Sequence, residues 1–150
     1  MNLSNNFTLA ELTKTSYPVE NIPTVEHIEN LRKLCVNVLQ PIRDSFRRPV
    51  KVNSGYRSAA LNKLTKGSQT SDHLTGLAAD IEISGVSNRQ LAEWIRDNLE
   101  FKELILEHHT EDDPSSGWVH VSYDEQDKRK ECLRAISENG RTIYLRGLHA

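Results

Sequence analysis

The chain has 150 residues, about the length of one domain, and its hydrophobic share of 37% is enough for a single core. A formal net charge of −2 argues against nucleic-acid binding, which requires a basic surface. No stretch approaches the roughly 20 apolar residues of a membrane span, so no membrane association is expected. The N-terminus has neither a basic start nor an apolar block, which predicts a cytoplasmic protein as synthesised. We expect one domain over residues 1–150 and a monomer.

The first half of the chain carries helical patterns. Residues 7–13 predict a short helix, in which Thr8 and Glu11 match a capping box. A longer helix is expected from Thr24, because apolar residues recur at spacings of three and four as far as residue 46. Pro41 lies inside this pattern and predicts a kink or an interruption.

Strand patterns follow and dominate the C-terminal third. A short strand is expected around residues 50–52, and alternating segments predict further strands at 78–84, 102–108 and 117–123. Between them, residues 87–99 predict an amphipathic helix that Ser87 would cap. The dipeptide Asn139-Gly140 predicts a hairpin turn between two more alternating runs. Because helices come early and strands late, the sequence predicts an α+β fold with an antiparallel sheet and N-terminal helices packed on it.

Three of these strands each place one polar side chain where a site could form. Side chains alternate between the two faces of a strand, so Asp80 opposes its apolar neighbours, and His120 likewise. Glu107 falls on the same face as Ile105. A polar group at mid-strand is costly unless it is paired or ligated. His73 enters from the loop before the Asp80 strand.

Two imidazoles and one carboxylate suit zinc. A catalytic zinc takes three protein ligands and keeps a fourth position for water. We therefore expect His73, Asp80 and His120 as metal ligands for Zn²⁺, with Glu107 as general base. This is the chemistry of peptide hydrolysis.

The segment SGYRS adds a candidate for substrate recognition. Arg57 lies on a turn that leads away from a core strand. A guanidinium presents a rigid fork that matches a carboxylate at two points. Arg57 is therefore expected to bind a substrate carboxylate.

The pattern SGYRS…LN…GSQTSDHLTGLAADIEI…LILE…GWVHVSY resembles the zinc D-alanyl-D-alanine carboxypeptidase-like peptidases of the M15 type. The small single-domain bacterial and phage subgroup is the most similar, and the hedgehog signalling domain shares the same metal arrangement. The resemblance implies zinc on His73, Asp80 and His120, and a substrate carboxylate on Arg57. It also implies that Ser71 contacts substrate or orders its loop.

The sequence departs from the family pattern at the catalytic base. Many relatives carry E-x-x-H, but Gly117 occupies the position three before His120. Glu107 then becomes the candidate, at the place of the glutamate in hedgehog-like domains. The acidic residues of the intervening loop are alternatives: Glu111, Asp112 and Asp113.

The sequence therefore predicts a zinc metallopeptidase that acts on peptidoglycan stem peptides. The D-Ala-D-Ala bond and the L-Ala-D-Glu bond are both candidate targets, so carboxypeptidase and endolysin-type endopeptidase remain open. Action on the cell wall would follow release by phage lysis or another route. The alternative hypotheses are a zinc-binding module without turnover and a phage structural component that retains the fold.

Overall fold

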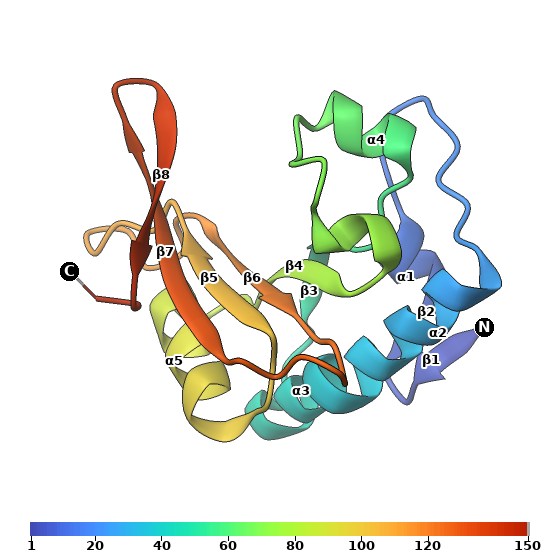
Figure 1. The fold of residues 1–150 in the computed structure, drawn as a ribbon. Helices are drawn as coiled ribbons and strands as arrows, with labels where there is room; N and C mark the ends of the chain where they lie inside the picture. Colours follow the sequence, from blue (N-terminus) through green and yellow to red (C-terminus); the bar gives the residue numbers. More distant parts are fainter. Residues whose placement is uncertain (150) are drawn as a thin grey trace.

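The computed structural model describes residues 1–149, and Figure 1 shows their helices and strands arranged around one six-stranded sheet. The strands lie in the order β3-β4-β6-β5-β7-β8. Their bounds are β3 Lys51–Ser54, β4 Ala78–Glu82, β5 Glu103–Glu107, β6 Trp118–Ser122, β7 Glu131–Glu138 and β8 Arg141–Arg146.

The N-terminal segment forms a small two-stranded sheet and a short helix. Strand β1 (Asn2–Ser4) pairs with β2 (Phe7–Thr8), and α1 (Leu9–Thr13) follows directly. The predicted capping box is confirmed, because the Thr8 side chain accepts from the Glu11 backbone and the Glu11 carboxylate accepts from the Thr8 backbone.

The long N-terminal helix is interrupted ahead of Pro41, as predicted. Helix α2 (Val25–Leu34) begins after Thr24, a π-helical turn (Cys35–Leu39) follows, and α3 (Gln40–Phe46) continues. Pro41 has no N–H and its ring crowds the preceding turn, so the regular ladder cannot pass through it. The apolar stripe faces the core regardless, and its fully buried members are Leu31, Leu34, Cys35, Val38, Leu39 and Ile42.

The remaining helices are short apart from α5 (Asn88–Asn98). Ser87 caps α5, and Leu91 and Ile95 are fully buried, whereas Trp94 and Leu99 are half-buried against the core. Helix α4 (Ala59–Leu64) and the 3₁₀ turn η2 (Asp72–Thr75) lie between β3 and β4. None of the helices in residues 1–149 has the length and apolar character needed to cross a bilayer.

The α+β class is confirmed, but the sheet is mixed and not antiparallel throughout. Strand β7 pairs parallel to β5, while the other neighbouring strands pair antiparallel. Strand β6 already has β4 and β5 on its two sides, so β7 cannot pair with it and instead adds at the outer edge of β5. Residues 123–130 carry the chain back to that edge, which makes β7 parallel to β5. The predicted Asn139-Gly140 turn then joins β7 to β8.

The two faces of the sheet differ in chemistry. One face packs against α2, α3 and α5 and is apolar, with Ile81, Leu104 and Val119 fully buried in the core. The opposite face carries Asp80 and His120. Figure 1 shows the β7–β8 hairpin and α4 standing at opposite ends of this second face.

Candidate metal centre

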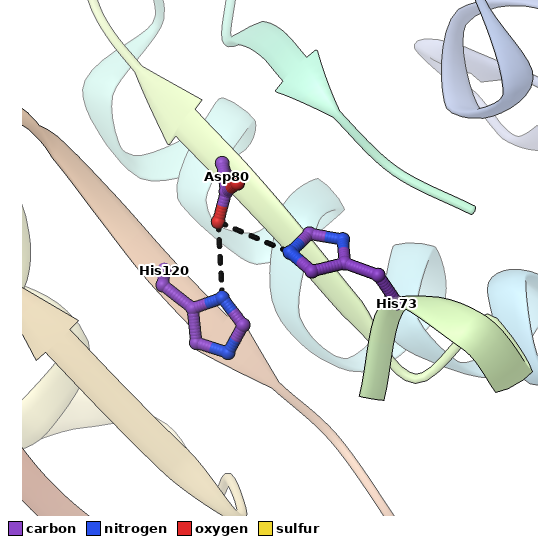
Figure 2. A group of neighbouring side chains, drawn as sticks. All are labelled: His73, Asp80 and His120. Carbon is purple, nitrogen blue, oxygen red and sulfur yellow. Dashed lines mark hydrogen bonds and ion pairs between the residues drawn. The ribbon is translucent and has the colours of Figure 1, made fainter. Parts of the chain in front are cut away.

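Three side chains from separate elements meet on the polar face of the sheet. His73 comes from η2, Asp80 from β4 and His120 from β6, and Figure 2 shows both rings turned toward the carboxylate. His73 Nε2 lies 3.3 Å and His120 Nδ1 lies 3.0 Å from Asp80 Oδ1. The three potential ligand atoms lie within 4.8 Å of one another. All three residues are buried, at 2%, 7% and 9% exposure respectively.

Backbone geometry produces this convergence. Asp80 and His120 are direct cross-strand partners, so their side chains leave the sheet on the same face. His73 is brought to them by η2, which ends at Gly76 with φ +79°. A Cβ on Gly76 would lie 2.6 Å from the carbonyl oxygen of His27, so this turn requires glycine.

The orientation of each ring suits a metal ligand. His73 Nδ1 donates to the Gly55 carbonyl over 2.7 Å, which leaves the Nε2 lone pair directed at Asp80. His120 presents Nδ1 to Asp80, and its Nε2 lies 3.9 Å from a carboxylate oxygen of Glu103. Two imidazole nitrogens and one carboxylate oxygen aimed at one point form a donor set that fits zinc.

Burial and the contacts within the cluster shift the pKa values of all three groups. Burial alone would raise the pKa of Asp80, but the two adjacent histidines stabilise the ionised carboxylate and hold that pKa below its usual range. Burial lowers the pKa of His73, which favours the neutral imidazole. Burial opposes the charge on His120 as well, but the hydrogen bond and charge of Asp80 outweigh it and raise the His120 pKa. An ionised carboxylate between two rings is the arrangement that a divalent ion would stabilise.

Arg57 lies in this cluster and makes its closest ionic contact with Asp80. Its Nη2 donates to Asp80 Oδ2 over 3.2 Å, while Nε donates to Ser54 and Nη1 to Asn62. A guanidinium has five N–H donors, so two remain after these three bonds. Arg57 thus fixes the carboxylate oxygen that does not face the histidines, and it also lines the adjoining cleft.

Ser71 orders the loop that presents His73. Its side chain accepts from the His73 backbone over 3.2 Å and caps η2. This matches one of the two roles expected for Ser71. The residue also lines the cleft, where a substrate could reach it.

Glu107 ends β5 next to the cluster. It is the cross-strand partner of Trp118, whose Nε1 donates to Glu107 Oε2 over 2.8 Å. The register places Glu107 on the same face as Ile105 and His120, as predicted. Burial raises the pKa of Glu107, with the Asp80 charge adding to the rise against the opposing effect of His120. A carboxylate with a raised pKa beside a polar cluster has the properties of a general base.

The acidic residues of the 110–113 loop lie elsewhere. The Glu111 side chain is 68% exposed and pairs with Arg89, which lowers its pKa. Asp113 binds Ser115 within its own loop. Among the described residues that line the cleft, the acidic ones are Asp72, Asp80, Glu103 and Glu107. The geometry thus favours Glu107 over the loop residues.

The cluster forms the floor of a cleft of about 700 Å³. Residues 65–68 and 70–73 line one side of it, and Leu133, Thr142 and Tyr144 of the hairpin line the other. Two parts of the cleft lining were not predicted from the sequence. Glu103 lies on the same strand face as Glu107, so the alternation of β5 could have identified it. No sequence pattern indicated that Leu133, Thr142 and Tyr144 of the hairpin would line the cleft.

A comparison with known protein families gives a match to Peptidase M15 over residues 5–122. The chain belongs to the Peptidase M15 family. Its members are D-Ala-D-Ala carboxypeptidase-like metallopeptidases that depend on zinc, in agreement with the three-ligand cluster. No curated protein matches the chain closely enough to add a relative.

Within this M15 domain, the missing E-x-x-H glutamate has a steric cause. Gly117 adopts φ +69°, and a Cβ placed there would lie 1.9 Å from the Glu107 carbonyl oxygen. The contact excludes a Cβ, and the positive φ adds a conformational cost for any residue other than glycine. A glutamate at position 117 is therefore incompatible with this backbone.

Proposed function

We propose that the protein is a zinc metallopeptidase that hydrolyses peptide bonds in peptidoglycan stem peptides. The observation that carries the proposal is the meeting of His73, Asp80 and His120 beside Glu107 on the floor of one cleft. Membership of the M15 family supports the reaction class. The stem-peptide substrate follows from the D-Ala-D-Ala carboxypeptidase-like character of the family.

The residues divide the work of hydrolysis. A zinc ion held by His73, Asp80 and His120 would supply a Lewis acid that activates water and polarises a carbonyl. Glu107 takes a proton from the attacking water and returns it to the leaving amine. The Trp118 N–H holds one Glu107 oxygen, which leaves the other oxygen to accept that proton.

Arg57 and Ser71 are the proposed substrate-binding residues. The two N–H donors of Arg57 that the protein does not use are available for a substrate carboxylate or carbonyl. Ser71 lines the same cleft and adds a hydroxyl. Removal of either group should raise KM and should leave the zinc content close to the native level.

The bond that is cut is either the D-Ala-D-Ala bond or the L-Ala-D-Glu bond. The first would make the protein a carboxypeptidase, and the second an endolysin-type endopeptidase. Mass analysis of muropeptides released from defined cell walls separates them, because each cut leaves fragments of different mass.

A Glu107→Gln variant tests the proposal. The amide keeps the size and the Trp118 contact but cannot accept the proton, so turnover should fall by about 10² or more. Zinc content should stay at the native level, because Glu107 is outside the ligand set. Glu138→Gln, a change of the same kind on exposed β7, should behave as native. Native turnover by Glu107→Gln would remove Glu107 from the mechanism.

The second candidate function is a zinc-binding module without turnover. The observation that favours it is Gly117 in place of the family glutamate. If the native protein holds zinc but releases no product from purified peptidoglycan or its stem peptides, this candidate replaces the first.

A further inference from the structure

The two sides of the cleft present different chemistry to a substrate. Residues 65–71 bring hydroxyls and the ammonium of Lys66, and Arg57 lies beside them. Asp72, the carboxylate on this side, is paired with Lys102 over 3.0 Å. The opposite side carries Leu133, Thr142 and Tyr144 of the β7–β8 hairpin. Arg129, which precedes β7, also lines the cleft, and it is paired with Asp127. A peptide in the cleft would therefore meet hydroxyl and cationic groups on one flank and the side chains of Leu133, Thr142 and Tyr144 on the other.

The sheet register aligns the hairpin flank with the base. Glu107 pairs with Ala135 across β5 and β7, and Ala135 pairs with Tyr144 across β7 and β8. Direct partners share a face, so the Tyr144 ring leaves the sheet on the same side as the Glu107 carboxylate, about 10 Å away at ordinary strand spacing. Because Ala135 is small and buried, no long side chain rises between them.

Tyr144 is available for contact. Its side chain is 54% exposed, and its hydroxyl has no hydrogen-bond partner among residues 1–149. Tyr144 lines the cleft, and burial raises the pKa of its hydroxyl, with the negative charges of Glu107, Glu103 and Asp80 adding to the rise. An amphipathic ring with a free hydroxyl contributes apolar area and one donor to a peptide.

We propose that Leu133, Thr142 and Tyr144, hereafter the hairpin subsite, bind a small apolar residue of the substrate peptide adjacent to the scissile bond. This inference rests on the proposed peptidase function. The hairpin also lies outside residues 5–122, so the family match does not account for it. The anionic part of the same peptide would lie against Arg57 and Lys66 on the other flank, by charge complementarity.

Kinetics of Tyr144 variants test the subsite on the full-length, zinc-loaded protein. The substrates are synthetic stem peptides with alanine beside the scissile bond and matched peptides with lysine there. Tyr144→Ala should raise KM for the alanine peptide by about five- to tenfold with kcat within about twofold, because it removes ground-state contact area. The preference for alanine over lysine should shrink by a similar factor. Tyr144→Phe, which keeps the ring, should retain most of that preference.

Arg141→Ala is the matched control, because Arg141 is exposed on the opposite face of β8. It should leave KM, kcat and zinc content at native values. Zinc content and melting temperature of Tyr144→Ala should also be native, which excludes misfolding as the cause. Native KM and native residue preference in Tyr144→Ala would overturn the hairpin subsite.

Failure of the proposed function is distinguishable from failure of the subsite. If the native protein hydrolyses no stem peptide, the proposed peptidase function is refuted. The hairpin subsite is then tested by peptide binding instead of by turnover. ¹⁵N-labelled Glu107→Gln protein would be titrated with the same peptides. The subsite is upheld if the peptide shifts the amide resonances of residues 142–146 and if these shifts disappear in the double variant that also carries Tyr144→Ala. It is refuted if the peptide leaves the β8 resonances unchanged.

Discussion

At the scale of single residues, the candidate centre is organised around one carboxylate. Asp80 receives His73 and His120 at one oxygen and Arg57 at the other, so both oxygens are engaged within the fold. Buried charges are tolerated only with such partners. The groups behind the histidines then control ring orientation, as Gly55 does for His73.

We expect Glu103 to take the corresponding role for His120 when zinc is bound. Its carboxylate lies 3.9 Å from His120 Nε2, and zinc-ligating histidines commonly present their second nitrogen to a carboxylate. Glu103→Gln should weaken zinc binding by about tenfold, because the amide no longer stabilises the ring N–H. Competition with a chromophoric chelator measures this. Glu138→Gln should keep native affinity, and an unchanged affinity in Glu103→Gln would assign that side chain to the cleft surface alone.

Glu107 gives a pH-dependent effect on the stability of the metal-free protein. Burial raises its folded pKa above the ordinary value of 4.5. Below about pH 4 the group is protonated in both states, so Glu107→Gln and native protein should melt at similar temperatures. As pH rises through the raised pKa, the native protein must ionise a buried carboxylate and loses stability relative to the variant.

Thermal unfolding at pH 4 and pH 8 in the presence of a chelator measures the difference. The melting temperature of Glu107→Gln minus that of native should be larger at pH 8. A difference that is the same at both pH values would show that Glu107 ionises freely. Glu138→Gln supplies the exposed comparison.

Strand alternation was sufficient to place Asp80, His120 and Glu107, but neither His73 nor the groups around the centre. Asp80, His120 and Glu107 could be assigned to one face because period two is a local property of a strand. The Arg57–Asp80 pair joins residues 23 positions apart and depends on how β3 meets β4. The Gly55 carbonyl on His73 is a backbone contact that no side-chain pattern encodes.

At the scale of elements, Gly117 couples β5 to β6. Its absent side chain lets the chain pass the Glu107 carbonyl, so Glu107 and Trp118 become partners. Gly117→Ala should therefore destabilise the protein by about 3 kcal/mol, from the clash and the positive φ together. Gly117→Glu, which restores E-x-x-H, should cost at least as much and should not raise activity.

Gly140→Ala separates the two contributions. Gly140 has φ +76°, close to that of Gly117, but a Cβ there meets no atom within 4 Å. It should cost only the conformational part, about 1 kcal/mol. Urea denaturation of both variants measures the gap, and equal losses would show that position 117 has room for a side chain.

Element prediction succeeded where the signal was local and failed where it was topological. The Thr8 and Ser87 caps, the helix start at Thr24 and the interruption near Pro41 follow from neighbouring residues. The parallel pairing of β7 with β5 does not, because it depends on which sheet edge is free when β7 forms. The antiparallel expectation was wrong at that pairing alone.

At the scale of the whole molecule, the two faces of one sheet have different roles: one forms the hydrophobic core and the other carries the candidate metal centre. Its apolar face anchors the helices, while the opposite face holds the metal-binding cluster between the η2 loop and the hairpin. The ligands come from residues 73, 80 and 120, so a bound ion would tie together segments that the unfolded chain keeps apart. Metal binding and folding should therefore be linked.

Zinc should raise the melting temperature of the protein, and chelation should lower it. An ion that binds only the folded state stabilises it by about 4 kcal/mol at a thousandfold excess over Kd, or about 10 °C for a chain of this size. His120→Ala should abolish the zinc-dependent shift, because two remaining ligands hold zinc poorly. His149→Ala, at an exposed histidine away from the cluster, should keep the full shift. If His120→Ala and the native protein gained equally from zinc, the ion would be binding at another place, and the cluster on β4, β6 and η2 would not be the metal centre.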